Sequence, residues 1–140
     1  MKIVIDRPPM YAEICSRFPK PKGPGAIFTF GDTIYTPGKA QITKALMAHE
    51  TIHSERQGGT EEQITAWWRN YLDDAAFRLE EEYPAHRAEF MAYCRYNQTG
   101  RDRYLRFVAE RLSGPLYGGL IKRQDAIQWI LTGNRPERKP

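Results

Sequence analysis

The stretch AHETIHSE, Ala48–Glu55, contains two of the three histidines of the chain, four residues apart, with a glutamate directly after the first. Apolar and histidine positions around it recur at intervals of three and four residues, from Ala45 to the next pair of glycines. This periodicity predicts a helix. Residues i and i+4 lie about 400° apart around a helix, so His49 and His53 project from one face, where both imidazoles can bind one metal ion.

The glutamate between the two histidines, Glu50, completes the H-E-x-x-H pattern of zinc peptidases. A catalytic zinc site has three protein ligands and leaves its fourth position to water. Zinc lowers the pKa of that water to about 7, and a carboxylate within reach takes the proton as the water attacks a carbonyl group. We therefore predict that His49 and His53 are zinc ligands and that Glu50 is the general base.

The source of the third ligand separates the classes of zinc peptidase. One large class continues the pattern as H-E-x-x-H-x-x-G-x-x-H, but Arg56 and Gly59 stand where this class needs glycine and histidine. That class is excluded. A glutamate from a later helix is the other source, and the stretch RLEEEYPAHRAEF offers three in a row, followed by a histidine. These residues are Glu80, Glu81, Glu82 and His86.

The pattern Glu82-x-x-Ala85-His86 resembles the glutamate-x-x-alanine signature of the gluzincins, the zinc peptidases with a glutamate ligand. The resemblance implies that Glu82 is the third ligand, and we expect Glu80 and Glu81 on a solvated acidic face. Gluzincins often carry, at the position of His86, an aspartate that hydrogen-bonds a zinc histidine. We expect His86 to support the ligands from behind in the same way, with a substitute ligand or an exposed side chain as the alternatives.

A longer stretch, residues 26–131, resembles the small metallopeptidases encoded by tailed bacteriophages and prophages. The resemblance rests on the segments FGDTIYTP, HETIHSERQ, WWRNYLDDAAFRLEEEYPAHRAEF and LSGPLYGGL. Together with the gluzincin pattern it implies a minimal zincin-like α+β fold. In such a fold one arm of a hairpin at residues 27–36 lines the cleft beside the active-site helix and pairs with the backbone of an extended substrate.

The remaining sequence predicts a single domain of residues 1–140 that is mostly helical, with a small N-terminal sheet. Lys2–Asp6 is expected to be a strand, and Gly31-Asp32 suits the two-residue turn of a hairpin. We expect residues 134–140 to be a flexible tail. Helices are expected at residues 11–18, 45–57, 60–72, 73–97, 99–112 and 122–131.

Two aromatic features outside the motif are candidates for a functional role. Tyr117, in the glycine-rich loop SGPLYGG, is our candidate for the residue that stabilises the tetrahedral intermediate beside the zinc ion, with simple packing as the alternative. The pair Trp67 and Trp68 could stack on bases, but adjacent residues of a helix do not share a face. We expect at least one of the two to be buried.

The net charge of +4 allows contact with nucleic acid, but acidic residues are interleaved with the basic ones, so we do not favour that partner. The arginines of RDRYLRFVAERL are expected on a solvated helix face. Cys15 and Cys94 are far apart and predicted to be reduced thiols. We expect no leader and no membrane contact, and hence the cytoplasm, that of the host if the protein is phage-encoded, with association with the virion as the alternative.

The sequence therefore predicts a zinc-dependent metallopeptidase that hydrolyses a peptide or protein substrate. The main alternative is a zincin-fold binding or structural module of a phage or virion, with a partner protein and no significant turnover. A second alternative is a regulator that contacts DNA. The intact His49, Glu50 and His53 favour the enzyme, because a purely structural zinc site has no need of Glu50.

Overall fold

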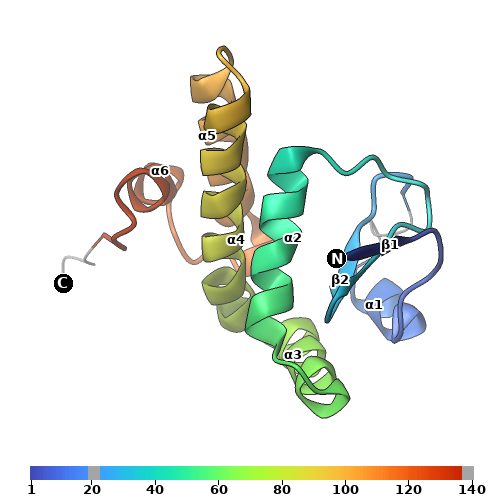
Figure 1. Ribbon diagram of the computed structural model, residues 1–140. Coiled ribbons are helices and arrows are strands. Elements are labelled where there is room, and N and C mark those ends of the chain that lie inside the picture. The colour runs from blue at the N-terminus through green and yellow to red at the C-terminus, as the bar shows by residue number, and fades with distance from the viewer. Residues whose placement is uncertain (19–22, 137–140) are drawn as a thin grey trace.

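The computed structural model describes residues 1–18 and 23–136. It has the predicted α+β composition, mostly helical with a small N-terminal sheet, and Figure 1 shows the sheet and the first helix beside a group of longer helices. In order the elements are β1 (Lys2–Val4), α1 (Tyr11–Arg17), β2 (Phe28–Phe30), β3 (Thr33–Tyr35), α2 (Lys44–Gln57), α3 (Glu61–Asp73), α4 (Ala75–Tyr96), α5 (Arg101–Leu112), the 3-10 helix η2 (Pro115–Tyr117) and α6 (Arg123–Thr132).

The sheet has three strands in the order β1-β3-β2, with β1 parallel and β2 antiparallel to β3. The predicted hairpin is confirmed: Phe30 pairs with Thr33 across Gly31 and Asp32, and Gly31 has a φ of 60°. A glycine adopts the positive φ that this turn requires without strain. The first strand ends at Val4, two residues before the predicted end. The sheet leaves β2 as an edge strand next to α2.

The helix that carries the histidines, α2, begins and ends at clear signals. The Thr43 side chain accepts a hydrogen bond from the Leu46 N–H at 3.1 Å, and Gly58 ends the helix at a φ of 89°. The next helix begins with a capping box of Thr60 and Gln63.

The longest helix, α4, lies side by side with α2 in Figure 1, and these two helices have the most extensive contact in the molecule. Asp74 caps α4 by accepting from the N–H groups of Ala76 and Phe77. The helix continues through Pro84. Side chains buried on α4 include polar as well as apolar residues, which is the feature that positions the candidate site.

Two apolar clusters flank the contact between α2 and α4. The C-terminal apolar cluster lies between α4, α5, α6 and η2, and the N-terminal apolar cluster lies between α1, β2 and α3. The first includes Leu79, Phe90, Leu105, Val108, Ala109, Leu112, Tyr117, Ala126, Trp129 and Ile130. The second includes Ile14, Phe28, Phe30, Trp67, Trp68, Tyr71 and Leu72.

Several smaller predictions can be compared with the structure. Both Trp67 and Trp68 are buried, as expected, and the arginine-rich helix α5 buries Leu105, Val108, Ala109 and Leu112 while its arginines are exposed. Cys15 and Cys94 are free thiols of intermediate exposure. The last four residues of the predicted flexible tail, 137–140, lie outside the described residues.

Within the part of the chain that the structure describes, none of the helices has the length and apolar character needed to cross a membrane.

Candidate metal centre

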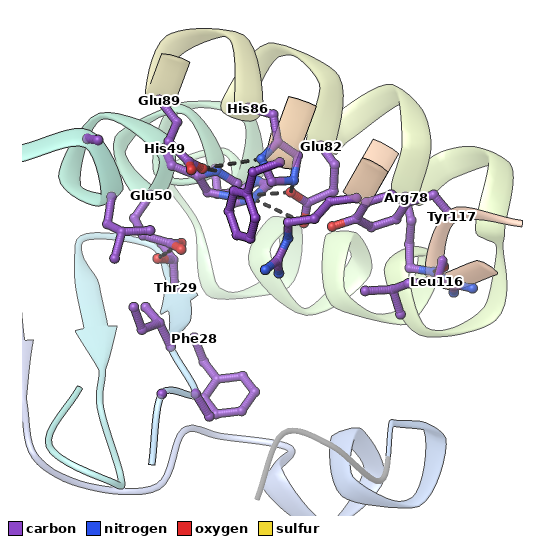
Figure 2. A pocket seen from close by; sticks show the side chains of 18 of the residues that line it. Phe28, Thr29, His49, Glu50, Arg78, Glu82, His86, Glu89, Leu116 and Tyr117 are labelled. Atoms are coloured by element: carbon purple, nitrogen blue, oxygen red, sulfur yellow. Dashed lines mark hydrogen bonds and ion pairs between the residues drawn. The ribbon is translucent and has the colours of Figure 1, made fainter. Parts of the chain in front are cut away.

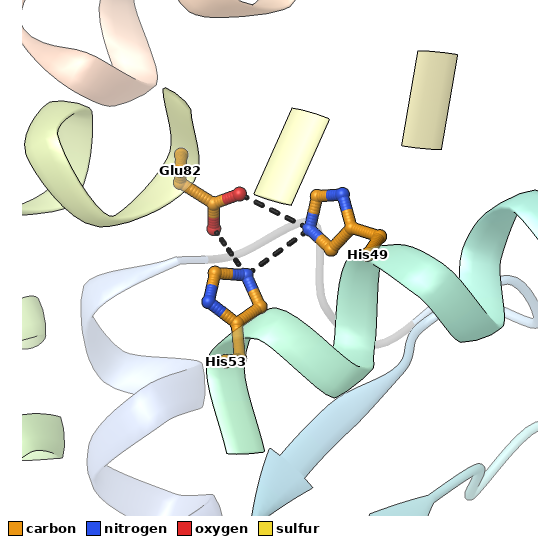
Figure 3. A group of neighbouring side chains, drawn as sticks. All are labelled: His49, His53 and Glu82. Carbon is orange, nitrogen blue, oxygen red and sulfur yellow. Dashed lines mark hydrogen bonds and ion pairs between the residues drawn. The ribbon is translucent and has the colours of Figure 1, made fainter. Parts of the chain in front are cut away.

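The predicted ligands meet at one point between α2 and α4. His49 and His53 project from successive turns of α2, and Glu82 reaches them from α4 (Figure 3). The two Nε2 atoms are 3.1 Å apart, and the Glu82 oxygens lie 3.2 Å from the Nε2 atom of His49 and 3.3 Å from that of His53. All three side chains are buried. The structure therefore brings together three candidate ligands from two helices.

These distances fit a zinc ion. With bonds of about 2.0–2.1 Å, the ligand atoms of a tetrahedral zinc site lie about 3.3 Å from one another, which agrees with the separations in this site. Oε2 of Glu82 is buried and has no hydrogen-bond partner among the described residues. Three converging lone pairs are unfavourable unless a cation or a proton lies between them. His49, His53 and Glu82 thus have the donor types, the spacing and the unsatisfied atom of a zinc site.

A fourth residue, Glu89, holds His49 from behind. Its Oε1 lies 2.7 Å from His49 Nδ1, and its Oε2 accepts a hydrogen bond of 2.5 Å from the Tyr104 hydroxyl. A proton on Nδ1 of His49 leaves Nε2 as the lone pair that faces Glu82 and His53. The carboxylate of Glu89 therefore sets both the tautomer and the orientation of the ligand ring.

The resemblance to gluzincins led us to expect a hydrogen bond from His86 to one of the two candidate ligand histidines. The structure shows no such bond between the described residues. Nδ1 of His86 lies 3.2 Å from Oε1 of Glu89, the oxygen that also faces His49, and its Nε2 lies 3.7 Å from Glu82. The expected place of His86 is taken by Glu89, two helical turns beyond Glu82. His86 is buried, so the alternative of an exposed side chain was wrong.

The predicted general base, Glu50, is buried and held from the sheet. The hydroxyl of Thr29 on β2 donates a 2.7 Å hydrogen bond to Oε2 of Glu50. In Figure 2, Glu50 and Thr29 lie on the same side of the metal ligands, facing the cleft. Both residues line this cleft with His49 and Glu82. The carboxylate is therefore placed beside the centre without being one of the three converging ligands.

The two tyrosines on the other side of the centre are Tyr71 and Tyr117. The Tyr71 hydroxyl donates a 2.6 Å hydrogen bond to Oε1 of Glu82, and Tyr117 lines the same cleft as Tyr71. Burial and the Glu82 carboxylate raise the pKa of both tyrosines well above its usual value, so both stay protonated and can donate. Tyr117 is only 2% exposed and lines the same cleft as the ligands, while its catalytic role stays a prediction.

Burial and neighbouring charged groups shift the pKa values of the candidate ligands His49 and Glu82 in opposite directions. Burial lowers the pKa of His49, but hydrogen bonds to Glu82 and Glu89 raise it well above its usual value. Burial raises the pKa of Glu82, but the charge of His53 and the close approach of both imidazoles lower it well below its usual value. A proton on His49 therefore stabilises the metal-free site, and metal binding must displace it.

The hairpin is tied to α2 by the side chain of Gln57. Its amide nitrogen donates to the carbonyl of Thr29 at 2.8 Å, and its oxygen accepts from the N–H of Gly31 at 2.7 Å. The indole of Trp68 donates to the same carbonyl at 3.0 Å. These side chains occupy part of the edge of β2, which restricts any pairing with a substrate backbone to the other end of the strand, where Ala26 and Ile27 line the cleft.

Of the two glutamates that precede Glu82, only Glu80 is on a solvated face. The expectation that Glu81 is solvated was wrong. Glu80 is exposed and pairs with Arg135, as expected for a solvated face. Glu81 is buried: it accepts hydrogen bonds from the Trp67 indole at 2.6 Å and from Arg56 at 2.5 and 2.8 Å. Burial of a carboxylate is tolerated here because cationic and neutral donors satisfy it.

The cleft that contains the centre has a volume of about 1640 Å³. This exceeds the roughly 300–1,000 Å³ of a drug-sized ligand pocket and is large enough for a peptide segment. Its wall is formed by β2 on one side and by η2, α4 and α5 on the other. Aromatic side chains supply much of its apolar lining.

The residues that sequence reasoning missed are Thr29, Tyr71 and Glu89. A signal for Glu89 exists, since Glu82, His86 and Glu89 follow one another at spacings of four and three, which places them along one helix face. Thr29 and Tyr71 have no comparable signal, because their contacts depend on how β2 and α3 pack against the centre.

Comparisons with known proteins do not assign the chain to a family: no family model, no curated protein and no solved structure gives a significant match.

Proposed function

We propose that this protein is a zinc-dependent metallopeptidase of gluzincin type. The observation that carries the proposal is the convergence of His49, His53 and Glu82 at the spacing of zinc ligands, with the carboxylate of Glu50 beside them in an open cleft. A zinc ion held by these ligands would activate a water molecule and polarise the carbonyl group of the substrate.

The residues around the ligands then have separate tasks. Glu50 takes the proton of the attacking water and passes it to the nitrogen of the leaving amine. The hydroxyl of Thr29 orients the Glu50 carboxylate through their 2.7 Å hydrogen bond. Glu89 orients the ring of His49. The hydroxyl of Tyr71 donates to the third ligand, and Tyr117, which lines the same cleft, is the candidate for binding the developing oxyanion.

Hydrolysis by the variant Glu50→Gln tests this function. The variant should keep its fold and its zinc, since Glu50 is not among the three ligands, but cleave peptides about 10²–10⁴-fold more slowly. Glu55→Gln is the matched control, because Glu55 lies on the same helix, is exposed and does not line the cleft. The measurement is the rate of cleavage of a broad peptide library by wild type and both variants.

Absence of cleavage by the zinc-loaded wild type, or equal rates for wild type and Glu50→Gln, would contradict the peptidase. Either result would favour the binding module as the function of the same site.

A further inference from the structure

Three arginines line the cleft, and two of them have no carboxylate partner among the described residues. Arg17 is paired with Asp73 at 2.8 Å. Arg78, on α4, and Arg111, in the last turn of α5, form no ion pair with any residue that the structure describes. An unpaired guanidinium on the wall of a cleft is a ready binding group for an anion.

Arg78 is held in place by the protein backbone. Its Nε donates to the Leu116 carbonyl at 2.8 Å, and its Nη1 donates to the carbonyls of Tyr71 at 2.6 Å and Leu72 at 3.3 Å. These bonds fix the plane of the guanidinium but leave its charge without a counter-ion, and no hydrogen bond is found for Nη2 among the described residues. Only Nη2 is therefore left to donate to a ligand, and its direction is set before any ligand arrives, which reduces the entropy lost on binding.

The position of Arg78 relative to the metal ligands can be bounded. Its Cζ lies 5.9 Å from the centre of the Tyr71 ring, and the hydroxyl of the same ring donates to Glu82 at 2.6 Å. One aromatic ring thus separates the guanidinium from the third ligand, a distance on the order of 10 Å. Since a chain spans about 3.3–3.6 Å per residue, this corresponds to about three residues of an extended peptide.

Arg111 lies near the second tyrosine of the pair. Its Cζ lies 5.5 Å above the ring of Phe107, and its positive charge opposes the rise in the pKa of Tyr117 caused by burial and by Glu82. Arg111 on α5 and Arg78 on α4 therefore line the same cleft as Tyr71 and Tyr117.

Arg78 lies apart from the carboxylates of the metal site. Figure 2 places Arg78 near Tyr117 and Leu116, away from Glu50 and Thr29. The buried carboxylates Glu50, Glu82 and Glu89 surround the metal site, whereas Arg78 and Arg111 supply positive charge on another part of the cleft wall, where an anionic group of a substrate is attracted. The guanidinium of Arg111 has no hydrogen bond to a described residue, so it can donate two parallel N–H groups to the two oxygens of a carboxylate, and Nη2 of Arg78 can add a further hydrogen bond.

We propose that Arg78 and Arg111 bind the C-terminal carboxylate of the substrate, so that the protein cleaves peptides within about three residues of a free C-terminus. The inference rests on the proposed peptidase function and names the substrate class of the same cleft.

Three peptides of otherwise identical sequence test it: one with a free C-terminus, one with a C-terminal amide, and one with a C-terminal amide and aspartate as its last residue. Cleavage is followed by mass spectrometry, and binding to the zinc-loaded Glu50→Gln variant by calorimetry. The free acid should be cleaved near its C-terminus with kcat/KM at least about 10-fold higher than the amide, and should bind more tightly by a similar factor.

Arg111→Gln should remove this preference, mainly through KM, whereas Arg106→Gln, an exposed arginine of the same helix outside the cleft, should keep it. Arg111 is exposed, so its replacement should not disturb the fold. Equal cleavage and equal binding of acid and amide would overturn the inference while the peptidase stands. An aspartate amide as good as the free acid would also overturn it, because a side-chain carboxylate would then be the group that is bound. If no peptide is cleaved, the proposed function fails, and the binding comparison alone decides the inference.

Discussion

The two faces of α4 are equally buried but opposite in chemistry. Toward α5 and α6 the helix presents Leu79 and Phe90, each 1% exposed, to the C-terminal apolar cluster. Toward α2 it presents Glu82, His86 and Glu89, which are 5%, 2% and 2% exposed. Apolar packing lowers the free energy of the folded state directly, whereas buried titratable groups are tolerated only when partners satisfy them.

This difference teaches where to look for function. Apolar side chains of similar volume would pack between α2 and α4 at no cost in stability, and often with a gain. A face that instead gathers histidines and carboxylates indicates a requirement other than folding. The apolar face of α4 accounts for the fold, and the polar face carries the candidate activity.

Removal of a metal ligand from the polar site between α2 and α4 should have the largest effect, which is the loss of zinc binding. Wild-type protein should contain about one zinc ion per chain, and His49→Ala, His53→Ala and Glu82→Gln should lose it, because the remaining ligands bind zinc weakly. Metal analysis after dialysis measures this, with Glu80→Gln, at an exposed position, as the control. Stoichiometric zinc in the double histidine variant would show that the centre is elsewhere.

A cavity on the apolar face of α4 should lower stability but leave zinc binding intact. Leu79→Ala should lower the free energy of unfolding by about 2–5 kcal/mol, because it removes buried apolar contacts from the C-terminal apolar cluster. The folded variant should still bind one zinc ion. Urea denaturation and metal analysis check the two parts, and loss of zinc by folded Leu79→Ala would mean that the two faces are not independent.

A smaller loss of zinc affinity is expected for Glu89, which contacts the ligand His49 but is not itself one of the three predicted ligands. Glu89→Gln keeps the size of the side chain but removes the charge that faces His49 Nδ1, so the affinity for zinc should fall about 10–100-fold while the fold is kept. Competition with a chelator of known affinity measures the change. An unchanged affinity would remove Glu89 from the metal centre.

The smallest effect is expected at Glu81, which is buried on α4 but bonded to Trp67 and Arg56. Glu81→Gln keeps an acceptor for the indole and loses the ion pair with a half-exposed arginine, so stability should fall by about 1 kcal/mol. Zinc content should not change. Loss of zinc in Glu81→Gln, with Glu82→Gln unaffected, would show that Glu81 is the third ligand and that Glu82 is not.

The sequence predicted those parts of the site that depend on local spacing. His49, Glu50 and His53 lie within two turns of one helix, so helix geometry alone places them together. The hairpin at Gly31 and the helices α2 and α3 depend on local patterns as well, and they are confirmed. For the same reason the fold class could be predicted.

The parts that the sequence did not predict depend on contacts between elements. Glu81 and Glu82 are adjacent in sequence, and only the packing of α4 against α2 and α3 decides that one faces Trp67 and the other faces His49. Thr29 reaches Glu50 from 21 residues away, across the boundary of sheet and helix. No periodicity within a single element contains such information.

The coordination of zinc tests the central claim most directly. A crystal structure of the zinc-loaded protein, with anomalous scattering at the zinc edge, should place the ion within about 2.0–2.1 Å of Nε2 of His49, Nε2 of His53 and a carboxylate oxygen of Glu82, with no protein ligand at the fourth position. A zinc ion between His49, His86 and Glu89, the second group among the described residues whose spacing could hold a metal, would contradict the account. A fourth protein ligand that closes the site would contradict it equally, because it would leave a structural centre without access for a substrate.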